Sequence, residues 1–530
     1  MTRSLFTLSD IARTGAGRFR NATALEDARG THRLTYGELW ACVQTSAGVL
    51  RALGLAPRDR VLLYMDGSPD WITAFLSIVH AGLVAVPIPG QAPPELARAA
   101  AWYAEVKACV CGESTRDAGS RISAVRCLTP AALVASDASP VPVTTATPDA
   151  TAVLVFTSGS TSNPRAVALS HDNLLANLRS LMEVRRAREG EALLSTLPPS
   201  HAFELVAGQL APLAAGARIV YAGTLLPNRL VELMRGRAIT RILSVPSLVE
   251  VLAREILGIL TAGGTIESTC RESTIEDLAS AFRRMEPPEQ GRIRRAVRNC
   301  VGPSFRNLVV GGAALGPVWA DLLPGIGIEL EVGYGLTEAG PIVAVGFEAE
   351  CPSGSVGRPL PGISVRVDVH GEILVRSEGV MQGYFKDAAG SAAALEDGWL
   401  RTGDCGRLDD EGFLFVTGRL KEAIVTASGE TVYPDEIEPF YSSALFAGHC
   451  VVPVRGRDGN DVPTLVVEPA STDTSDAELQ QAFLALRAAA PPRLRAASMV
   501  RYAGRFPRTA LGKIRRRALA DSLAREGVPA

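Results

Sequence analysis

Runs of apolar residues alternate with amphipathic stretches along most of the chain. Residues 60–67, RVLLYMDG, have the pattern of a buried strand, and residues 83–88, LVAVPI, have the same pattern. Between them, residues 68–82 carry apolar side chains at helical spacing behind Ser68, which suits a helix N-cap. Strand, helix and strand in this order predict a parallel sheet with right-handed crossovers.

The same alternation returns further along the chain. Residues 217–223, 227–238 and 240–247 predict strand, helix and strand, and residues 305–312 predict a strand followed by the helical stretch LGPVWADLLPG. Residues 255–300 have the pattern of a polar helical insertion. We therefore predict an α/β fold whose large N-terminal part contains two βαβ-rich subdomains.

The pattern changes in the last third of the chain. Between residues 351 and 418, short β-branched runs separated by glycine turns predict a small β-rich subdomain. From about residue 421 onward the sequence is rich in Ala and Arg, has a helical pattern, and includes a late Gly-Lys turn. We place a domain boundary after residue 418, giving domains 1–418 and 419–530, the second a small α+β domain.

Composition narrows the classes of protein that remain. A chain of 530 residues is too long for one core, and its net charge of −2 argues against a nucleic-acid binder. The N-terminal residues hold no signal-peptide pattern and no run of about 18 apolar residues exists, so we expect a cytoplasmic protein with no membrane span. Nine scattered cysteines fit neither a disulfide framework nor a zinc finger, and free thiols are expected.

A loop rich in small residues follows an apolar run. The apolar segment TAVLVF leads into FTSGSTSNPRAVALSH, residues 156–171. The small residues from Thr157 to Thr161 let backbone N–H groups converge on an anion, and their hydroxyls add donors. The loop suits phosphate, although a plain turn has the same composition. Because G-x-x-x-x-G-K-[ST] is absent, a P-loop NTPase is excluded.

Five further motifs follow in a fixed order. They are LSHDNL, GYGLTEAGP at 333–341, WLRTGD at 399–404, GRLKEAIVTASGETVYPDEIE at 418–438, and PRTALGKIRRR at 507–517. Together with TSGST they resemble the adenylate-forming superfamily of acyl-CoA synthetases, adenylation domains and luciferases. The resemblance spans roughly residues 25–520 and is greatest to long-chain fatty acyl-CoA synthetases.

The resemblance implies ATP-dependent activation of a carboxylic acid to an acyl adenylate, helped by Mg²⁺. Positioned donors and a cation are what such phosphate chemistry requires. Glu338 would bind Mg²⁺ and Thr337 would contact the α-phosphate, both as catalytic residues. Tyr334 would lie against adenine. The other residues assigned to the nucleotide on this side of the site are Thr157, Ser158, Gly159, Ser160, Thr161, Arg165, Gly312, Ala313, Ala314 and Gly335.

The remaining implied residues come from the end of the chain. Asp404 would accept from both ribose hydroxyls, and Arg419 would add a second contact. Lys513 resembles the catalytic lysine that bridges the carboxylate and the α-phosphate. In this family the small domain is mobile, and Lys421 matches its hinge. Gly429 would line the tunnel for the pantetheine arm.

The acid and the thiol acceptor are less constrained. His201, in LPPSHAFEL, matches the residue at the mouth of the family's acyl pocket and is assigned to catalysis. No aspartate stands where amino-acid-activating domains hold the ammonium group, and Leu205, Val206, Ala207 and Gly311 suit an apolar chain. We expect a medium- or long-chain fatty acid and coenzyme A. The phosphopantetheine of an acyl carrier protein is the alternative acceptor.

The phosphate loop departs from the family spelling at three positions. Ser162, Arg165 and Ala166 stand where glycine, lysine and glycine are usual. A nucleotide-binding relative that has lost turnover is therefore an alternative of another class. The presence of Glu338, Asp404 and Lys513 argues against it. We expect altered ATP affinity or slower closure of a stiffer loop.

Overall fold

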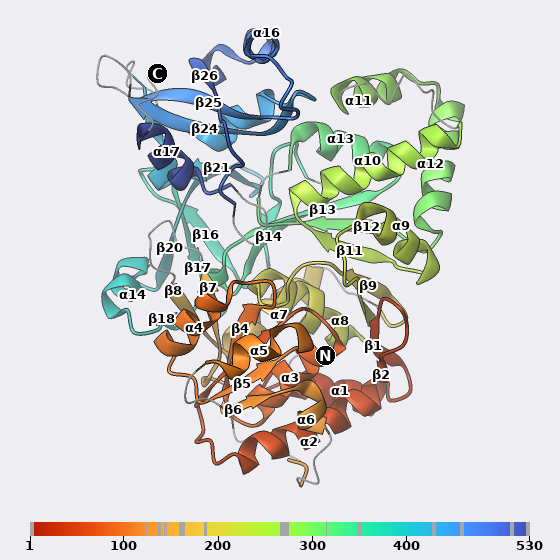
Figure 1. The fold of residues 1–530 in the computed structure, drawn as a ribbon, viewed down its shortest axis with the longest axis vertical. Coiled ribbons are helices and arrows are strands. Elements are labelled where there is room, and N and C mark those ends of the chain that lie inside the picture. The colour runs from red at the N-terminus through yellow and green to blue at the C-terminus, as the bar shows by residue number, and fades with distance from the viewer. Residues whose placement is uncertain are drawn as a thin grey trace.

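The computed structural model describes residues 5–122, 126–134, 139–141, 144, 146–157, 165–184, 188–264, 275–313, 315–347, 351–426, 431–455, 461–508 and 514–525. Its fold is α/β, as the alternating pattern predicts, with parallel and mixed sheets packed against helices (Figure 1). Within these residues, no helix is long and apolar enough to cross a bilayer.

The first predicted βαβ unit lies at the centre of a seven-stranded sheet. Strand β3 (Arg60–Met65) runs parallel to β4 (Val84–Pro89), and helix α3 (Pro69–His80) connects them. The Ser68 hydroxyl accepts a hydrogen bond of 3.2 Å from the Trp71 amide, which confirms the N-cap. The order β18-β8-β7-β4-β3-β5-β6 is completed by β5 (Ala108–Cys111), β6 (Arg126–Leu128), β7 (Thr151–Thr157), β8 (Arg165–Ser170) and β18 (Gly383–Tyr384).

A nine-stranded sheet forms the second half of the large domain, in the order β15-β14-β13-β12-β11-β9-β10-β1-β2. Strands β9 to β13 run parallel, with β9 lying between β10 and β11. The two strands predicted around residues 217–247 are therefore separated by a third. The strands are β1 (Thr23–Asp27), β2 (Arg33–Thr35), β9 (Ala192–Ser195), β10 (Arg218–Tyr221), β11 (Arg241–Ser244), β12 (Asn307–Val310), β13 (Glu329–Gly335), β14 (Ile342–Phe347) and β15 (Arg358–Pro359).

Helices from the predicted polar insertion belong to the core of this second half. They are α10 (Pro246–Ala262), α11 (Ile275–Arg284) and α12 (Pro287–Val301). Their inner faces bury Ile256, Phe282 and Ile293 in one apolar cluster with Leu308 of β12. The helical prediction is correct, but the polar residues occupy only the outer faces, because the inner faces cover the sheet.

Other helices cover the two large sheets. They are α1 (Asp10–Arg18), α2 (Tyr36–Ala52), α4 (Pro94–Tyr103), α5 (Arg116–Ser120), α6 (Pro130–Val134), α7 (His171–Val184), α8 (Ala211–Ala215), α9 (Pro227–Gly236) and α13 (Pro317–Gly325). A π-helical segment, Glu204–Leu210, precedes α8. Cores on either side of the sheets are formed largely by these helices.

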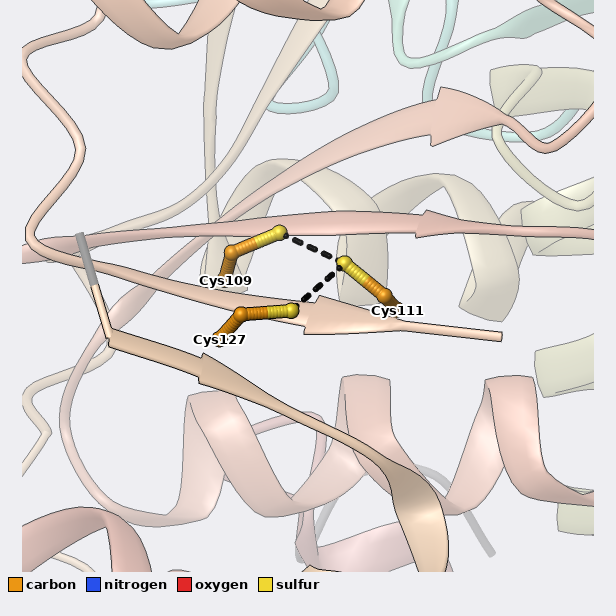
Figure 2. A group of neighbouring side chains, drawn as sticks. All are labelled: Cys109, Cys111 and Cys127. Carbon is orange, nitrogen blue, oxygen red and sulfur yellow. Dashed lines mark hydrogen bonds between the residues drawn. The ribbon is translucent and has the colours of Figure 1, made fainter. Parts of the chain in front are cut away.

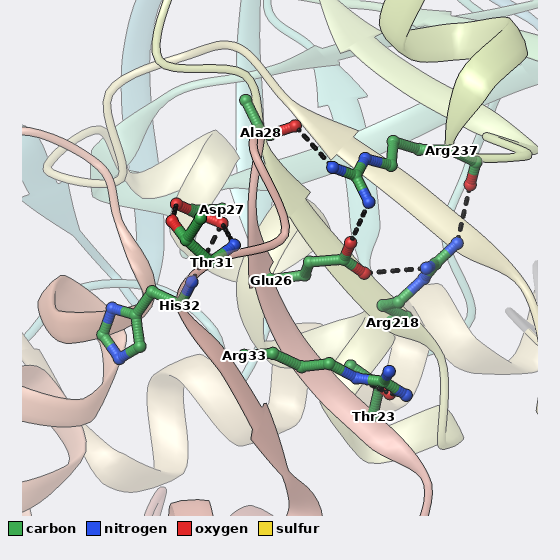
Figure 3. A network of polar contacts seen from close by, with 9 residues as sticks. All are labelled: Thr23, Glu26, Asp27, Ala28, Thr31, His32, Arg33, Arg218 and Arg237. Atoms are coloured by element: carbon green, nitrogen blue, oxygen red, sulfur yellow. Dashed lines mark hydrogen bonds and ion pairs between the residues drawn. The ribbon is translucent and has the colours of Figure 1, made fainter.

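A buried carboxylate joins strand β1 to its neighbour β10 and to the residue that follows α9 (Figure 3). Glu26 of β1 is bound through one oxygen to Arg218 of β10 and through the other to Arg237, each at 2.8 Å. The Arg237 guanidinium also donates to the Ala28 carbonyl at 3.0 Å. The paired charges compensate one another, so the acid can be buried.

The β-rich region predicted between 351 and 418 is a five-stranded sheet. It contains β16 (Ser364–Val367), β17 (Glu372–Arg376), β19 (Leu395–Glu396), β20 (Trp399–Leu408) and β21 (Leu414–Arg419). Helix α14 (Ala388–Ala394) lies beside it. The short glycine-bounded runs of the sequence therefore form antiparallel strands.

The C-terminal residues form a separate three-stranded sheet, blue in Figure 1. Its strands are β24 (Phe446–Arg455), β25 (Asp461–Pro469) and β26 (Ser498–Arg501), packed with α15 (Pro434–Ile437), α16 (Asp476–Ala489) and α17 (Arg516–Arg525). The region is thus less helical than its Ala/Arg-rich sequence indicates. Two apolar clusters lie wholly within residues 424–523. The boundary after residue 418 stays a prediction.

Candidate functional site

Several of the predicted nucleotide residues lie at the carboxyl ends of adjacent parallel strands. Gly312 and Ala313 follow β12, and Tyr334 and Gly335 end β13. In open α/β sheets, this edge is where ligands bind, because the loops beyond the strand ends diverge and leave a crevice. Gly312 has a φ of +84°, a conformation that favours glycine.

Asp404 is the centre of a polar contact between the large sheet and the β-rich subdomain. One carboxylate oxygen accepts from the Tyr334 hydroxyl at 2.9 Å, and the other lies 3.1 Å from Nε of Arg419. Asp404 and Arg419 are paired across β20 and β21, so the sheet register brings them together. Burial and the charge of Asp404 raise the pKa of Tyr334, which keeps its hydroxyl protonated as a donor. Three residues predicted around the nucleoside are therefore in mutual contact.

Glu338 is held by a residue that the sequence did not single out. Its carboxylate accepts from the Tyr384 hydroxyl at 3.0 Å, and its backbone carbonyl accepts from the Met381 amide at 2.9 Å. Tyr384 ends β18, which pairs with β8. Burial and the charge of Glu338 raise the pKa of Tyr384. A half-buried carboxylate in this position supplies the oxygen ligands that Mg²⁺ requires.

Arg165 contacts the same tyrosine. Its guanidinium lies 4.8 Å from the centre of the Tyr384 ring, and its Nε is 3.5 Å from Asp387. Tyr384 therefore contacts both the cation at the end of the phosphate loop and the carboxylate of Glu338. Arg165 is suited to this stacking because its guanidinium is planar and delocalised.

The phosphate loop joins two antiparallel strands. Residues 158–164 connect β7 to β8, with Thr157 paired to Arg165 in the last register position. The apolar run TAVLVF does form a buried strand, as predicted. The connection is a hairpin, unlike the strand-to-helix connection of a Walker loop. Ser158, Gly159, Ser160, Thr161 and Ser162 lie outside the described residues.

Two glycines allow the TEAG turn to pack closely. Thr337 and Glu338 lie in a 3₁₀ turn, Thr337–Ala339. A Cβ at Gly335 would lie 1.9 Å from the Pro341 carbonyl oxygen, and one at Gly340 would lie 2.2 Å from that of Gly379. Only glycine lets the backbone come this close to a carbonyl oxygen at both positions. The two glycines of GYGLTEAG therefore determine the position of Glu338.

Ser200, His201 and Glu204 bring together buried polar atoms with no hydrogen-bond partner in the described structure. Such atoms are the Ser200 hydroxyl, Nε2 of His201 and one carboxylate oxygen of Glu204. Burial lowers the pKa of His201 to about 4, so the imidazole is neutral near pH 7. Because buried polar groups are normally paired, this concentration indicates a place where a ligand or water supplies the partner.

Apolar side chains flank this segment. Leu205 and Val206 are buried in the π-helical segment, with Ala207 beside them. A Cβ at Gly311 would lie 3.1 Å from the Phe203 ring, so glycine at this position leaves room for the aromatic side chain. Phe203 therefore brings Gly311 close to the segment that contains His201, so the predicted acyl-pocket residues lie near one another.

Glu204 is a second residue that the sequence analysis did not assign to the site. Its first carboxylate oxygen accepts from Ser195 at 2.6 Å and from Gln209 at 2.8 Å. Burial raises its pKa to about 8. Tyr384 belongs to none of the quoted motifs, and Glu204 lies in LPPSHAFEL beside His201 but was given no role; only their contacts reveal them.

Three further predicted residues, Ala314, Gly429 and Lys513, lie outside the described structure. The adjoining segments are ordered around Arg516, at the start of α17. Its guanidinium contacts Glu422 at 2.7 Å, and Asp435 and Glu438 at 2.8 Å each. Glu422 follows Lys421 in the 3₁₀ turn Leu420–Glu422. The chain just after Lys513 is therefore tied to the predicted hinge.

The chain is similar in sequence to a known family and to known ligases. The AMP-binding enzyme family matches residues 12–385. The chain is 30% identical over 446 residues to the long-chain-fatty-acid–CoA ligase FadD15 of Mycobacterium bovis, covering 77% of this chain and 74% of the relative. It is 28% identical over 530 residues to the indoleacetate–CoA ligase of Aromatoleum aromaticum, covering 93% and 94%.

A solved structure shows the same fold. The o-succinylbenzoate CoA synthetase MenE of Bacillus subtilis, in complex with its acyl-adenylate intermediate OSB-AMP, superposes with a TM-score of 0.79 at 21% identity, over 96% of this chain and 97% of that one. The chain belongs to the AMP-binding enzyme family. Family and relatives together support an acid–thiol ligase.

Proposed function

We propose that this protein uses ATP and Mg²⁺ to activate a medium- or long-chain fatty acid as its acyl adenylate, and then transfers the acyl group to coenzyme A. The observation that carries the proposal is the pair of carboxylates beside the carboxyl end of β13, one from β20 and one from the turn after β13. Asp404 is bound to Tyr334 and Arg419, and Glu338 is bound to Tyr384. One carboxylate suits a sugar with two hydroxyls, and the other suits a hard cation.

In this proposal each residue has a separate task. Asp404 accepts hydrogen bonds from the ribose, and Tyr334 orients the nucleoside. Arg165, with the small residues of the hairpin loop, holds the β- and γ-phosphates, while Thr337 donates to the α-phosphate. Mg²⁺, bound through Glu338, would neutralise charge on the phosphates as pyrophosphate leaves. Lys513 would bridge the carboxylate and the α-phosphate.

The acid is inferred from the surroundings of His201. Leu205 and Val206 are apolar and buried, and the neutral His201 places no charge against a hydrocarbon chain. The relatives include one named for long-chain fatty acids and one named for indoleacetate. We favour the fatty acid because burial alone lowers the pKa of His201, with no charged neighbour among the described residues contributing, which suits an apolar chain.

The acceptor is inferred from the relatives and the compact segment 358–385. Coenzyme A is the acceptor named for both ligases. An acyl carrier protein bearing phosphopantetheine is the alternative. Gly429 would leave space for the pantetheine arm, which both acceptors share.

The direct test is a panel of acids incubated with enzyme, ATP and Mg²⁺. Pyrophosphate release that requires a fatty acid supports adenylation, and its absence with every acid would favour the nucleotide-binding non-enzyme. Coenzyme A and a carrier protein are then compared for thioester formation by mass spectrometry. Preference for arylacetates or hydroxycinnamates would replace the fatty acid, and thioester on the carrier alone would replace coenzyme A.

Lys513 and the domain rotation are tested by separating the half-reactions. Lys513→Ala should strongly reduce acyl-adenylate formation, while thioester formation from supplied acyl adenylate continues. Equal loss of both halves would contradict the proposed change of position by the C-terminal domain.

The unusual phosphate loop needs its own variant. Arg165→Lys with Ser162→Gly restores the usual spelling at two positions but removes the planar group that stacks on Tyr384. We expect a changed ATP KM or kcat. If neither changes, the spelling has no functional consequence.

A further inference from the structure

Three cysteines that are scattered in the sequence meet at the edge of the seven-stranded sheet (Figure 2). Cys109 and Cys111 are two residues apart on β5, so their side chains point to the same face. Cys127 lies on the edge strand β6 and is the register partner of Cys109. The parallel pairing of β5 and β6 therefore gathers all three thiols.

The three sulfur atoms are close but not bonded to one another. Sγ of Cys111 lies 3.0 Å from Sγ of Cys109 and 3.1 Å from Sγ of Cys127, and all three atoms lie within 4.8 Å of one another. A disulfide would require about 2.0 Å. A thiolate-bound ion about 2.3 Å from each sulfur requires separations of about 3.8–4.0 Å. The sulfur–sulfur separation that such an ion requires lies between the shortest observed separation, 3.0 Å, and the limit of 4.8 Å that includes all three sulfur atoms.

The sulfurs pack closely against helix α5, and the described residues supply no fourth ligand. A Cβ at Gly119 would collide with Sγ of Cys111 and would lie 3.3 Å from Sγ of Cys127, so only glycine at this position lets the sulfurs approach the helix. Cys109 and Cys111 are fully buried, and Cys127 is partly exposed, which leaves one side for entry. In the described residues, no His, Asp, Glu or further Cys joins the group.

These observations favour a soft cation of low coordination number. Thiolate ligands select Cu(I), Zn²⁺ and iron–sulfur clusters, and protein-bound structural Zn²⁺ is almost always four-coordinate. A largely buried set of three sulfurs suits Cu(I). Binding of Cu(I) would be coupled to loss of the thiol protons. We propose that Cys109, Cys111 and Cys127 form a three-coordinate Cu(I) site, distinct from the nucleotide site.

The test is an anaerobic titration of the full-length reduced protein with Cu(I), in competition with a chromophoric Cu(I) chelator. We expect one equivalent per chain, with thiolate-to-copper charge-transfer absorption in the ultraviolet. Cys127→Ser should weaken binding by more than about 100-fold, since it removes a direct ligand. Cys300→Ser, at a buried cysteine of α12 outside the cluster, should leave it unchanged.

A second measurement avoids dependence on the folding of a variant. In the wild-type protein, bound Cu(I) should protect Cys127, the partly exposed member of the cluster, from alkylation that occurs in the copper-free protein, as identified by peptide mass spectrometry. The proposal would be overturned if the wild-type protein bound Cu(I) no more tightly than Cys127→Ser does. Protection of cysteines outside the cluster would also overturn it. So would tighter binding of Zn²⁺ with a fourth, non-sulfur ligand, or a disulfide that persists in the reduced protein.

Discussion

Asp404 and Glu338 are both acids of short motifs, but their neighbours suit them to different tasks. Asp404 is largely buried between a tyrosine hydroxyl and a guanidinium, so it is fixed as a hydrogen-bond acceptor. Glu338 is less buried and accepts from a single tyrosine hydroxyl among the side-chain contacts described. At the residue scale, contacts of this kind separate sugar binding from cation binding.

Tyr384→Phe tests the contact to Glu338. The variant keeps the ring under Arg165 but removes the hydroxyl, and a hydrogen bond to a charged group contributes about 1.5–3 kcal/mol. We expect kcat for adenylation to fall about tenfold or more, with a higher Mg²⁺ requirement, in a pyrophosphate-release assay. Tyr103→Phe, which loses a hydrogen bond to the nearby Phe385 carbonyl, is the control and should keep its Mg²⁺ dependence. Equal behaviour of the two variants would contradict the role of Tyr384.

Glu204 predicts a pH dependence of stability. Burial raises its pKa to about 8, above the ordinary value near 4.5, so the folded protein holds a proton that the unfolded chain releases. The free energy of unfolding should therefore fall as pH rises from about 4.5 to about 8, and this contribution should level off above that.

Glu204→Gln should remove this contribution because an amide does not titrate in this range. Relative to wild type, the variant should become more stable by a few kcal/mol as pH rises from 5 to 8. Urea unfolding at a series of pH values measures the difference. A difference that is constant across this range would show that Glu204 is already ionised in the folded protein.

The element that positions Glu338 is a turn whose geometry depends on glycine. Gly335 and Gly340 bracket the 3₁₀ turn, and each lies closer to a backbone carbonyl than a side chain permits. Gly340 also has a φ of +92°, which is strained for other residues. The turn thus lies tightly against residues 377–381 of the β-rich subdomain.

Gly340→Ala should displace this turn. The new Cβ would lie 2.2 Å from the Gly379 carbonyl oxygen, so backbone must move, and we expect a loss of more than about 3 kcal/mol in unfolding free energy together with adenylation activity. Gly412→Ala is the control, because its φ is +82° but no atom lies within 4 Å of the new Cβ. That variant should lose only about 1–2 kcal/mol and remain active. If both variants lost similar unfolding free energy and activity, the positive φ alone, and not the close contact with Gly379, would explain the effect of Gly340→Ala.

For the whole molecule, a charged cluster connects the predicted hinge with the chain that follows Lys513. Arg516 binds acids from the 3₁₀ turn containing Lys421 and from the region of α15. The predicted hinge and the chain after Lys513 therefore belong to one charged cluster. This linkage would let rotation at the hinge move the lysine segment as a unit.

Arg516→Ala should leave three acids without their common partner. We expect a loss of about 3 kcal/mol in unfolding free energy and a larger fall in adenylation than in thioester formation. Arg515→Ala, at an exposed neighbour, should change stability by less than about 0.5 kcal/mol. Denaturant unfolding and the separated half-reactions measure both effects. If both half-reactions fall equally, Arg516 stabilises the domain without positioning Lys513.

Much of the fold could be predicted from local pattern. The β3–α3–β4 unit, its Ser68 cap and the β-rich region between 351 and 418 follow from periodicity and glycine turns, which depend on neighbouring residues. The position of β9 between β10 and β11 could not be predicted, because strand order depends on packing between distant segments. For the same reason, the polar sequence of α11 and α12 concealed a buried inner face.

The sequence by itself determined the motifs: the small-residue loop, Tyr334 and Glu338 in one run, Asp404 in another, and Lys513 near the end. Each motif is a short run of consecutive residues, and the order of the motifs along the chain identified the family. Only the tertiary structure brought Tyr384 to Glu338, concentrated unpaired polar atoms at Ser200, His201 and Glu204, and gathered three cysteines on two strands. Tyr384 and Glu338, and Cys127 and Cys109, are far apart along the chain and meet because strands pair in a definite register. Ser200, His201 and Glu204 are neighbours in the sequence, but only the fold decides that their polar atoms are buried without partners in the described structure.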